Sequence, residues 1–212
     1  MNSLMDLHKQ SAAEVGRQIA AGLDPVEVAD VFLERIEAHA DQPIFITVTA
    51  GRALQEALAS RERHRLGAPL GPLDGVPIAW KDLIDVAGAP TTAGSDLHRD
   101  NLPADQDAPI VANAAAAGMV TLGKVNLTEF AYSGLGLNPH FGTPTLPHDL
   151  KTPRSPGGSS SGSATAVSWG LAPCAIGSDT GGSVRIPAAF NGLVGYKSSE
   201  GRIAKDLSLI HI

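Results

Sequence analysis

Apolar and polar positions near the start of the chain repeat with the period of amphipathic helices. Ser11 and Glu14 form a capping-box pattern, which satisfies the free amide groups at a helix start. Gly22 stands where such a helix would end, because glycine readily adopts the left-handed conformation of a helix C-cap. We therefore predict a helix over residues 12–21.

A second helix is predicted from Asp24-Pro25, where proline takes the first helical position and no amide donor is required. Its apolar side chains recur at helical spacing over residues 28–36. A short apolar run at residues 43–49 then predicts a strand. A third helix with a narrow apolar stripe follows and is expected to end near His64.

From residue 67 onward the pattern changes to short apolar runs that glycine and proline interrupt. Val76–Trp80 and Met119–Leu122 predict buried strands. An alanine-rich helix is expected at residues 107–117 between them, and Asn126–Glu129 can cap another short helix. Because strands and helices alternate, the pattern favours an α/β fold with a largely buried sheet.

Two loops rich in glycine and serine, at residues 153–163 and 177–183, lie on either side of an apolar segment. That segment, Ala164–Ala175, is interpreted as a helix. A single such loop is typical of a flexible linker. Two of them around one helix favour a site that is built from backbone groups.

Composition narrows the classes of function. The chain has 212 residues, a formal net charge of −6 and one cysteine, Cys174. This charge argues against direct binding of nucleic acid, and one cysteine excludes an intramolecular disulfide. The start of the chain lacks the apolar stretch of a secretory signal, and no apolar run is long enough to cross a bilayer. We therefore expect a soluble cytoplasmic protein that has no contact with membranes.

Three kinds of site are excluded by details of spacing. Gly158–Gly162 matches the G-x-S-x-G pattern centred on Ser160, but Pro-Arg-Ser-Pro stands where a strand should precede it, and the only later histidine is His211. Gly118–Lys124 matches the start of a phosphate-binding loop, but Val125 replaces the required serine or threonine. The seven histidines lack zinc-ligand spacing, so we expect neither a metal nor a cofactor.

Five segments together closely resemble the amidase signature family. They are Gly75–Asp82, Gly123–Phe130, Pro156–Ser163, Gly177–Ala188 and Gly195–Lys197. The resemblance runs from about residue 10 to about residue 204. It implies a layered α/β/α fold around a mixed β-sheet that is truncated on the C-terminal side, because family members are about twice as long.

The resemblance also implies one domain over residues 1–212. A helical N-terminal region reaches about residue 66, and the catalytic core spans about residues 67–204. Residues 205–212 form a tail that departs from the family pattern.

The family's catalytic triad maps onto Ser183 as the nucleophile, Ser159 as the bridging serine and Lys81 as the base. By the same resemblance, the Gly158–Ser159 peptide bond is cis. The oxyanion hole would use the backbone amides of Thr180, Gly181, Gly182 and Ser183. We expect three supporting side chains: Ser160 bonded near Lys81, and an ion pair of Asp179 with Arg185.

The chemistry explains this choice of residue types. A serine hydroxyl needs a base to become a nucleophile, and a lysine can serve once burial has lowered its pKa. The implied mechanism moves a proton from Ser183 through Ser159 to neutral Lys81, and returns it to the leaving nitrogen. Positioned proton transfer of this kind contributes on the order of 10²–10⁴-fold to the rate.

The resulting hypothesis is hydrolysis of a linear, non-peptide carboxamide to an acid and ammonia or an amine through an acyl-enzyme. A second hypothesis is the glutaminase (A) subunit of a tRNA-dependent amidotransferase, which works with partner subunits. A third is an inactive fragment or a non-catalytic anion binder whose Gly/Ser loops form backbone nests. The identity of the small amide substrate and the presence of a homodimer stay open.

Overall fold

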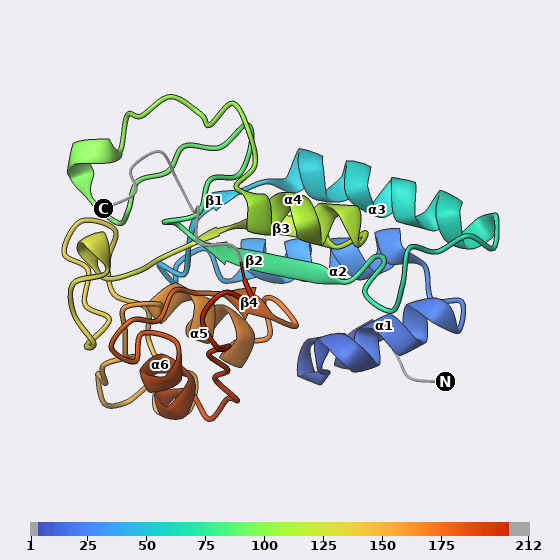
Figure 1. Ribbon diagram of the computed structural model, residues 1–212. Coiled ribbons are helices and arrows are strands. Elements are labelled where there is room, and N and C mark those ends of the chain that lie inside the picture. The colour runs from blue at the N-terminus through green and yellow to red at the C-terminus, as the bar shows by residue number, and fades with distance from the viewer. Residues whose placement is uncertain (1–3, 204–212) are drawn as a thin grey trace.

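The computed structural model describes residues 4–203 and shows a small sheet with helices around it (Figure 1). The 3₁₀ helices are η1 (Leu4–Lys9), η2 (Asp96–His98) and η3 (Glu129–Ala131). The α-helices are α1 (Ala12–Ala20), α2 (Pro25–Ala38), α3 (Ala50–Arg65), α4 (Pro109–Ala116), α5 (Ser161–Ser168) and α6 (Arg185–Phe190). The strands are β1 (Phe45–Val48), β2 (Pro77–Lys81), β3 (Val120–Val125) and β4 (Ala175–Ile176).

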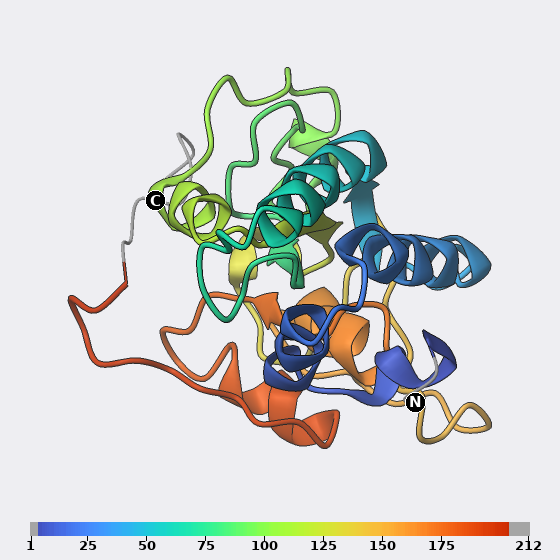
Figure 2. The same ribbon diagram turned by 90° about the vertical axis from the view of Figure 1, so that its right-hand side faces the viewer.

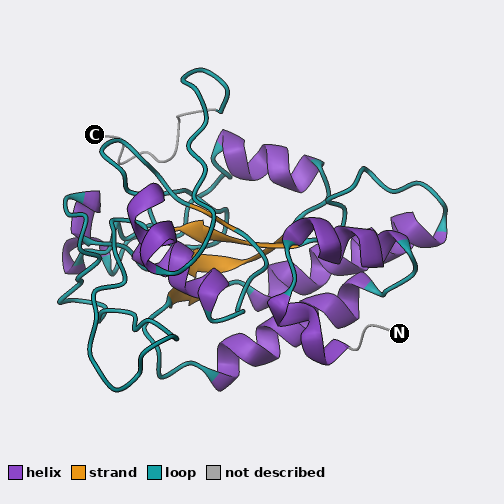
Figure 3. Ribbon diagram, turned by 90° about the horizontal axis from the view of Figure 1, so that it is seen from below, coloured by secondary structure: helices purple, strands orange, loops and turns teal. Residues whose placement is uncertain are grey.

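The sheet has the strand order β1-β3-β2-β4. β2 runs parallel to both β3 and β4, whereas β1 runs antiparallel to β3, so the sheet is mixed. Seen from below, the strands lie in the middle with helices on both sides (Figure 3). Every residue of β2 and β3 is buried. The predicted α/β/α layering around a mixed sheet is confirmed.

The helix starts read from the sequence are present. Ser11 Oγ accepts a hydrogen bond from the Glu14 amide at 3.2 Å, and Asp24 Oδ1 accepts one from the Val26 amide at 2.9 Å. α2 begins at Pro25 and buries Phe32, as its apolar spacing predicts. Each predicted boundary in this part of the chain lies within a few residues of the observed one.

The helix predicted over Ala164–Ala175 is wrong in its position. α5 begins earlier, at Ser161 inside the Gly/Ser loop, and ends at Ser168. Its first turn lies on the backbone of Asn126, since the Gly162 amide donates to the Asn126 carbonyl at 2.8 Å. A Cβ on Gly162 would lie 2.3 Å from the Asn126 nitrogen, so only glycine permits this packing.

The last residues of that apolar segment form β4, a two-residue strand that pairs with β2. Two further helices differ from expectation. The short helix near Asn126–Glu129 is the 3₁₀ helix η3, and α6 was not predicted at all. The chain after α6 runs along the outside of the molecule (Figure 2), where Val194 is 97% exposed.

Within residues 4–203, none of the helices has both the length and the apolar character that are needed to cross a bilayer. The strand β1, which lies in the predicted helical N-terminal region, joins the sheet next to β3. The tail predicted at residues 205–212 lies outside the described residues.

The contact between β1 and β3 requires a glycine. Gly123 has φ +156°, and a Cβ at this position would lie 2.3 Å from the Thr47 carbonyl oxygen. The ring of Phe45, the first residue of β1, also lies 3.2 Å from that Cβ position. β1 can therefore approach β3 closely only where β3 has no side chain.

We predict that Gly123→Ala destabilises the fold by about 2 kcal/mol or more, because the new methyl group must displace the β1 backbone. Gly51→Ala is the matched control. Gly51 is exposed near the start of α3 and has open space around it, so the alanine should be neutral or stabilise by about 0.5 kcal/mol. Urea unfolding of both variants measures the difference. Equal stability of the two variants would show that β1 does not depend on this contact.

Candidate active site

Lys81 is the last residue of β2, which lies between β3 and β4 in the sheet. Its side chain is fully buried, with 0% exposure. The ammonium nitrogen lies 2.7 Å from Ser159 Oγ and 2.8 Å from Ser178 Oγ. Both hydrogen-bond partners are neutral hydroxyl groups. Within the described residues, Lys81 forms no ion pair with a carboxylate, and Asp179 pairs with Arg185 instead.

This environment changes the proton affinity of the lysine. Burial lowers the pKa of Lys81 from 10.5 to about 7, and the charge of Asp179 opposes that shift only partly. A buried lysine without a close counter-ion loses much of the solvation of its charged form. Near neutral pH a large fraction of Lys81 is therefore neutral and able to accept a proton.

Ser159 is buried in a tight turn, and the peptide bond between Gly158 and Ser159 is cis, as the family resemblance implies. Two backbone hydrogen bonds hold the turn. The Gly158 amide donates to the Gly134 carbonyl at 2.8 Å, and the Thr128 amide donates to the Ser159 carbonyl at 3.0 Å. These bonds fix the backbone that carries the Ser159 hydroxyl next to Lys81.

Ser183 lies half-buried in the turn before α6. Its backbone carbonyl accepts a hydrogen bond from the Ser160 amide at 3.2 Å, so the two serine-bearing segments are joined directly. Within the described residues, no hydrogen bond links the Ser183 hydroxyl to Ser159. Ser160 was expected to form a hydrogen bond near Lys81. Its Oγ donates to the Ser178 carbonyl at 3.3 Å, and the hydroxyl of Ser178 accepts a hydrogen bond from Lys81.

The expected ion pair of Asp179 with Arg185 is present, with a shortest distance of 2.8 Å. The hydrogen bond from Arg185, helped by backbone amides, holds the pKa of Asp179 well below its usual range although burial opposes this. The Asp179 carboxylate also accepts the amides of Gly182 and Val184, at 2.9 and 3.0 Å. Asp179 therefore ties the whole turn around Ser183 together.

The four backbone amides expected in the oxyanion hole are not equivalent. The Gly182 amide donates to Asp179 Oδ1 at 2.9 Å. The turn places the Asp179 carboxylate next to the Gly182 amide, so these two groups form a hydrogen bond. In the part of the chain that the structure describes, the amides of Thr180, Gly181 and Ser183 donate no hydrogen bond.

Sequence reasoning missed two parts of this region. Ser178 was not singled out, although its hydroxyl accepts a hydrogen bond from Lys81. The second is a fully buried ion pair of Lys124 with Asp82 at 2.6 Å. A lysine inside an apolar strand was the available signal, since a buried charge requires a partner.

The sequence of this chain matches a known protein family and is similar to several known proteins. Residues 27–208 match the family described as Amidase. The chain is 45% identical over 204 residues to the A subunit of glutamyl-tRNA(Gln) amidotransferase from Cupriavidus necator, covering 96% of this chain and 39% of that protein. The corresponding protein of Chloroflexus aggregans is 42% identical and is covered to 41%. The chain thus spans about two fifths of the length of these relatives.

Solved structures show the same fold. The native peptide amidase of Stenotrophomonas maltophilia superposes with a TM-score of 0.85 at 37% identity, over 92% of this chain and 41% of that one. A fatty acid amide hydrolase superposes with a TM-score of 0.79 at 28% identity, over 89% of this chain and 33% of that one.

The buried lysine predicts a dependence of stability on pH. The pKa of Lys81 is about 7 in the folded chain against 10.5 ordinarily. Between these values the unfolded state binds more protons, so stability rises with pH across this window. We therefore expect Lys81→Met to be more stable than the wild type near pH 7. The advantage should shrink by up to about 1.4 kcal/mol per pH unit as the pH approaches 10.

Thermal unfolding of both proteins from pH 6.5 to 10 measures this difference. Lys151→Met is the matched control, because the Lys151 ammonium is exposed and loses no water on folding. Its stability difference from the wild type should be the same at every pH. A pH-independent difference for Lys81→Met would show that burial does not disfavour the charged lysine.

Proposed function

This chain belongs to the amidase family, and we propose that it forms the catalytic core of a serine hydrolase that cleaves carboxamides. One observation carries the proposal. The amine of Lys81 is fully buried and lies 2.7 Å from the hydroxyl of Ser159, in a segment that is hydrogen-bonded to the segment of Ser183. The Lys81 amine, the Ser159 hydroxyl and the segment that carries Ser183 therefore come from three parts of the chain and are linked by hydrogen bonds, which supports the proposal.

In the proposed reaction, Lys81 accepts a proton from Ser159, and Ser159 accepts one from Ser183. The Ser183 oxygen attacks the amide carbonyl and gives a tetrahedral intermediate. The proton then passes back through Ser159 to the leaving nitrogen, which departs as ammonia or an amine. Water hydrolyses the acyl-enzyme by the same relay. The lysine can act as the base because burial has lowered its pKa to about 7.

The negative oxygen of the intermediate requires donors. We assign this role to the backbone amides of Thr180, Gly181 and Ser183, which are free of other hydrogen bonds within the described residues. Asp179 holds the Gly182 amide and thereby keeps the turn in one conformation before substrate arrives. Donors that are already oriented stabilise the transition state without reorganisation.

A second function is favoured by the names of the relatives. Proteins of 42–45% identity are the A subunits of glutamyl-tRNA(Gln) amidotransferases. Under this alternative the same triad would release ammonia from glutamine for partner subunits. The two functions differ in substrate, because a free amidase turns over simple linear amides without a partner.

Labelling with a fluorophosphonate tests the proposed nucleophile without knowledge of the substrate. We expect one adduct by intact mass on the wild-type chain and none on Ser183→Ala. Lys81→Ala should label on the order of 10²-fold more slowly, because the relay loses its base. Ser199→Ala, which changes an exposed serine, is the matched control and should label like the wild type. A chain that is folded by circular dichroism and stays unlabelled would contradict the assignment.

Release of ammonia separates the free amidase from the amidotransferase component. A free amidase should release ammonia from simple aliphatic amides when the chain is extended to the length of its relatives. An amidotransferase component should act on glutamine and accelerate by at least about tenfold when partner subunits and charged tRNA are added, since assembly completes its site. Turnover of simple amides that partner subunits leave unchanged would exclude the second function.

A further inference from the structure

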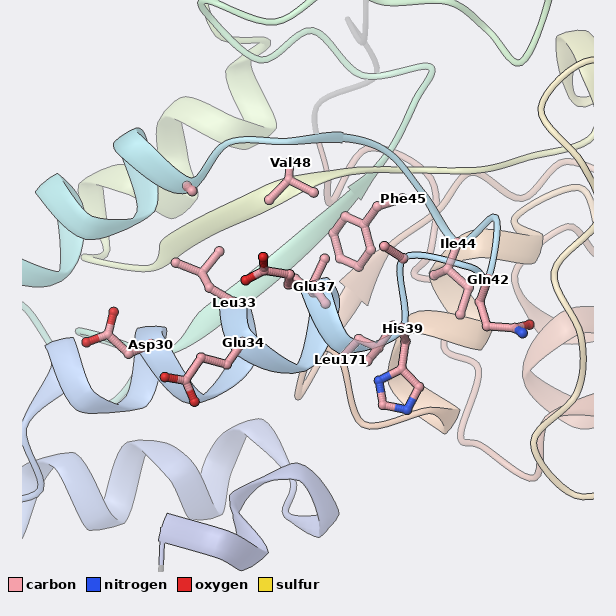
Figure 4. Close-up of a pocket in the computed structure, with 13 residues that line it drawn as sticks. Asp30, Leu33, Glu34, Glu37, His39, Gln42, Ile44, Phe45, Val48 and Leu171 are labelled. Atoms are coloured by element: carbon pink, nitrogen blue, oxygen red, sulfur yellow. The ribbon is translucent and has the colours of Figure 1, made fainter.

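A groove of about 450 Å³ opens between α2 and the segment of residues 39–48 (Figure 4). It lies at the β1 edge of the sheet, at the opposite end of the strand order from β4. Its floor is apolar and buried, and is made by Ile36, Ile44 and Leu171. The groove is therefore a separate feature from the site around Lys81.

The walls of the groove are also apolar in part. Leu33 of α2 and Phe45 of β1 are half-buried, and Val48 is 44% exposed. Figure 4 shows Leu33 and Glu37 rising from α2 on the side where Phe45 and Val48 lie. A ligand in the groove would cover apolar surface that water now contacts, which is favourable.

The rim of the groove on α2 is acidic. Asp30, Glu34 and Glu37 lie one helical turn apart in sequence and are all exposed. In residues 4–203, neither Glu34 nor Glu37 forms an ion pair. Asp30 is different, because it lies near Arg61. The pKa of the Arg61 guanidinium is raised mainly by Asp24 and to a smaller extent by Asp30.

Within residues 4–203, no lysine or arginine pairs with Glu34 or Glu37. No lysine or arginine is among the described residues that line the groove. Arg35, the arginine nearest in sequence, points elsewhere and donates to the carbonyls of Gly170 and Trp169 at 2.8 and 3.0 Å. His39 lines the groove, but its ring packs against Trp169 with centroids 5.3 Å apart. Among the described residues, two carboxylates thus remain beside apolar surface without a counter-ion.

We propose that this groove docks a segment of a partner polypeptide in which lysine or arginine alternates with apolar residues. The apolar side chains contact Leu33, Phe45 and Val48, and the cations pair with Glu34 and Glu37. Charge complementarity selects this chemistry, because an acidic or uncharged segment would leave both carboxylates unpaired beside a desolvated surface. β1 also has a free edge in the described sheet, so the backbone of an extended segment can bond to it.

Binding of a model peptide tests the proposal. The probe is a fluorescein-labelled peptide of alternating leucine and lysine, titrated with the full chain in a fluorescence anisotropy assay. Saturable binding that weakens with added salt is expected. Glu34→Gln/Glu37→Gln should weaken it about 3- to 30-fold, because two charge pairs are lost. Val48→Ser should weaken it as well, since it removes exposed apolar wall without disturbing the core.

Glu27→Gln is the matched control. Glu27 is exposed on α2 and outside the groove, so the peptide affinity should change less than about twofold. A peptide of alternating leucine and glutamate should not bind. The proposal is overturned by the absence of saturable binding, by equal binding of the glutamate peptide, or by equal weakening in Glu27→Gln. Circular dichroism confirms that each variant is folded before it is titrated.

Discussion

The burial of one amine at the end of the central strand governs the rest of the site. Lys81 leaves water completely and finds only two hydroxyl groups at hydrogen-bonding distance among the described residues. The sheet makes this possible, because β2 has a neighbour on each side and its end is closed by the loops of both serine segments. A more exposed lysine would stay charged, and a lysine beside a carboxylate would too. The fold thus favours the neutral form of Lys81.

The sequence predicts local structure well, but it does not predict the contacts that tertiary packing creates. Amphipathic spacing and caps located α1 and α2, because those signals are local. The position of α5 could not be predicted, since its start depends on the contact of Gly162 with Asn126, and that contact comes from tertiary packing. The triad positions came from the resemblance to a family. Ser178 escaped notice because only the folded chain brings it to Lys81.

The site and the groove lie toward different edges of the same sheet. Lys81 belongs to β2, next to the edge strand β4, while the groove borders β1 at the other edge. β3 separates β1 from β2 and carries Lys124, which forms the buried pair with Asp82. A partner seated on β1 would therefore contact the edge of the sheet that lies opposite β4.

The glycines in the turns that carry Ser159 and Ser178 limit which substitutions this protein can accept. A Cβ on Gly158 would lie 2.5 Å from the Gly136 nitrogen, and a Cβ on Gly177 would lie 2.5 Å from Ser160 Oγ. These clashes come from backbone and from a short side chain, which cannot move aside as a long one could. In a library of random variants, large losses of stability should thus also fall on positions that have no side chain, such as Gly158 and Gly177. Substitutions that the fold tolerates would have to fall on the surrounding loops, with these glycines left intact.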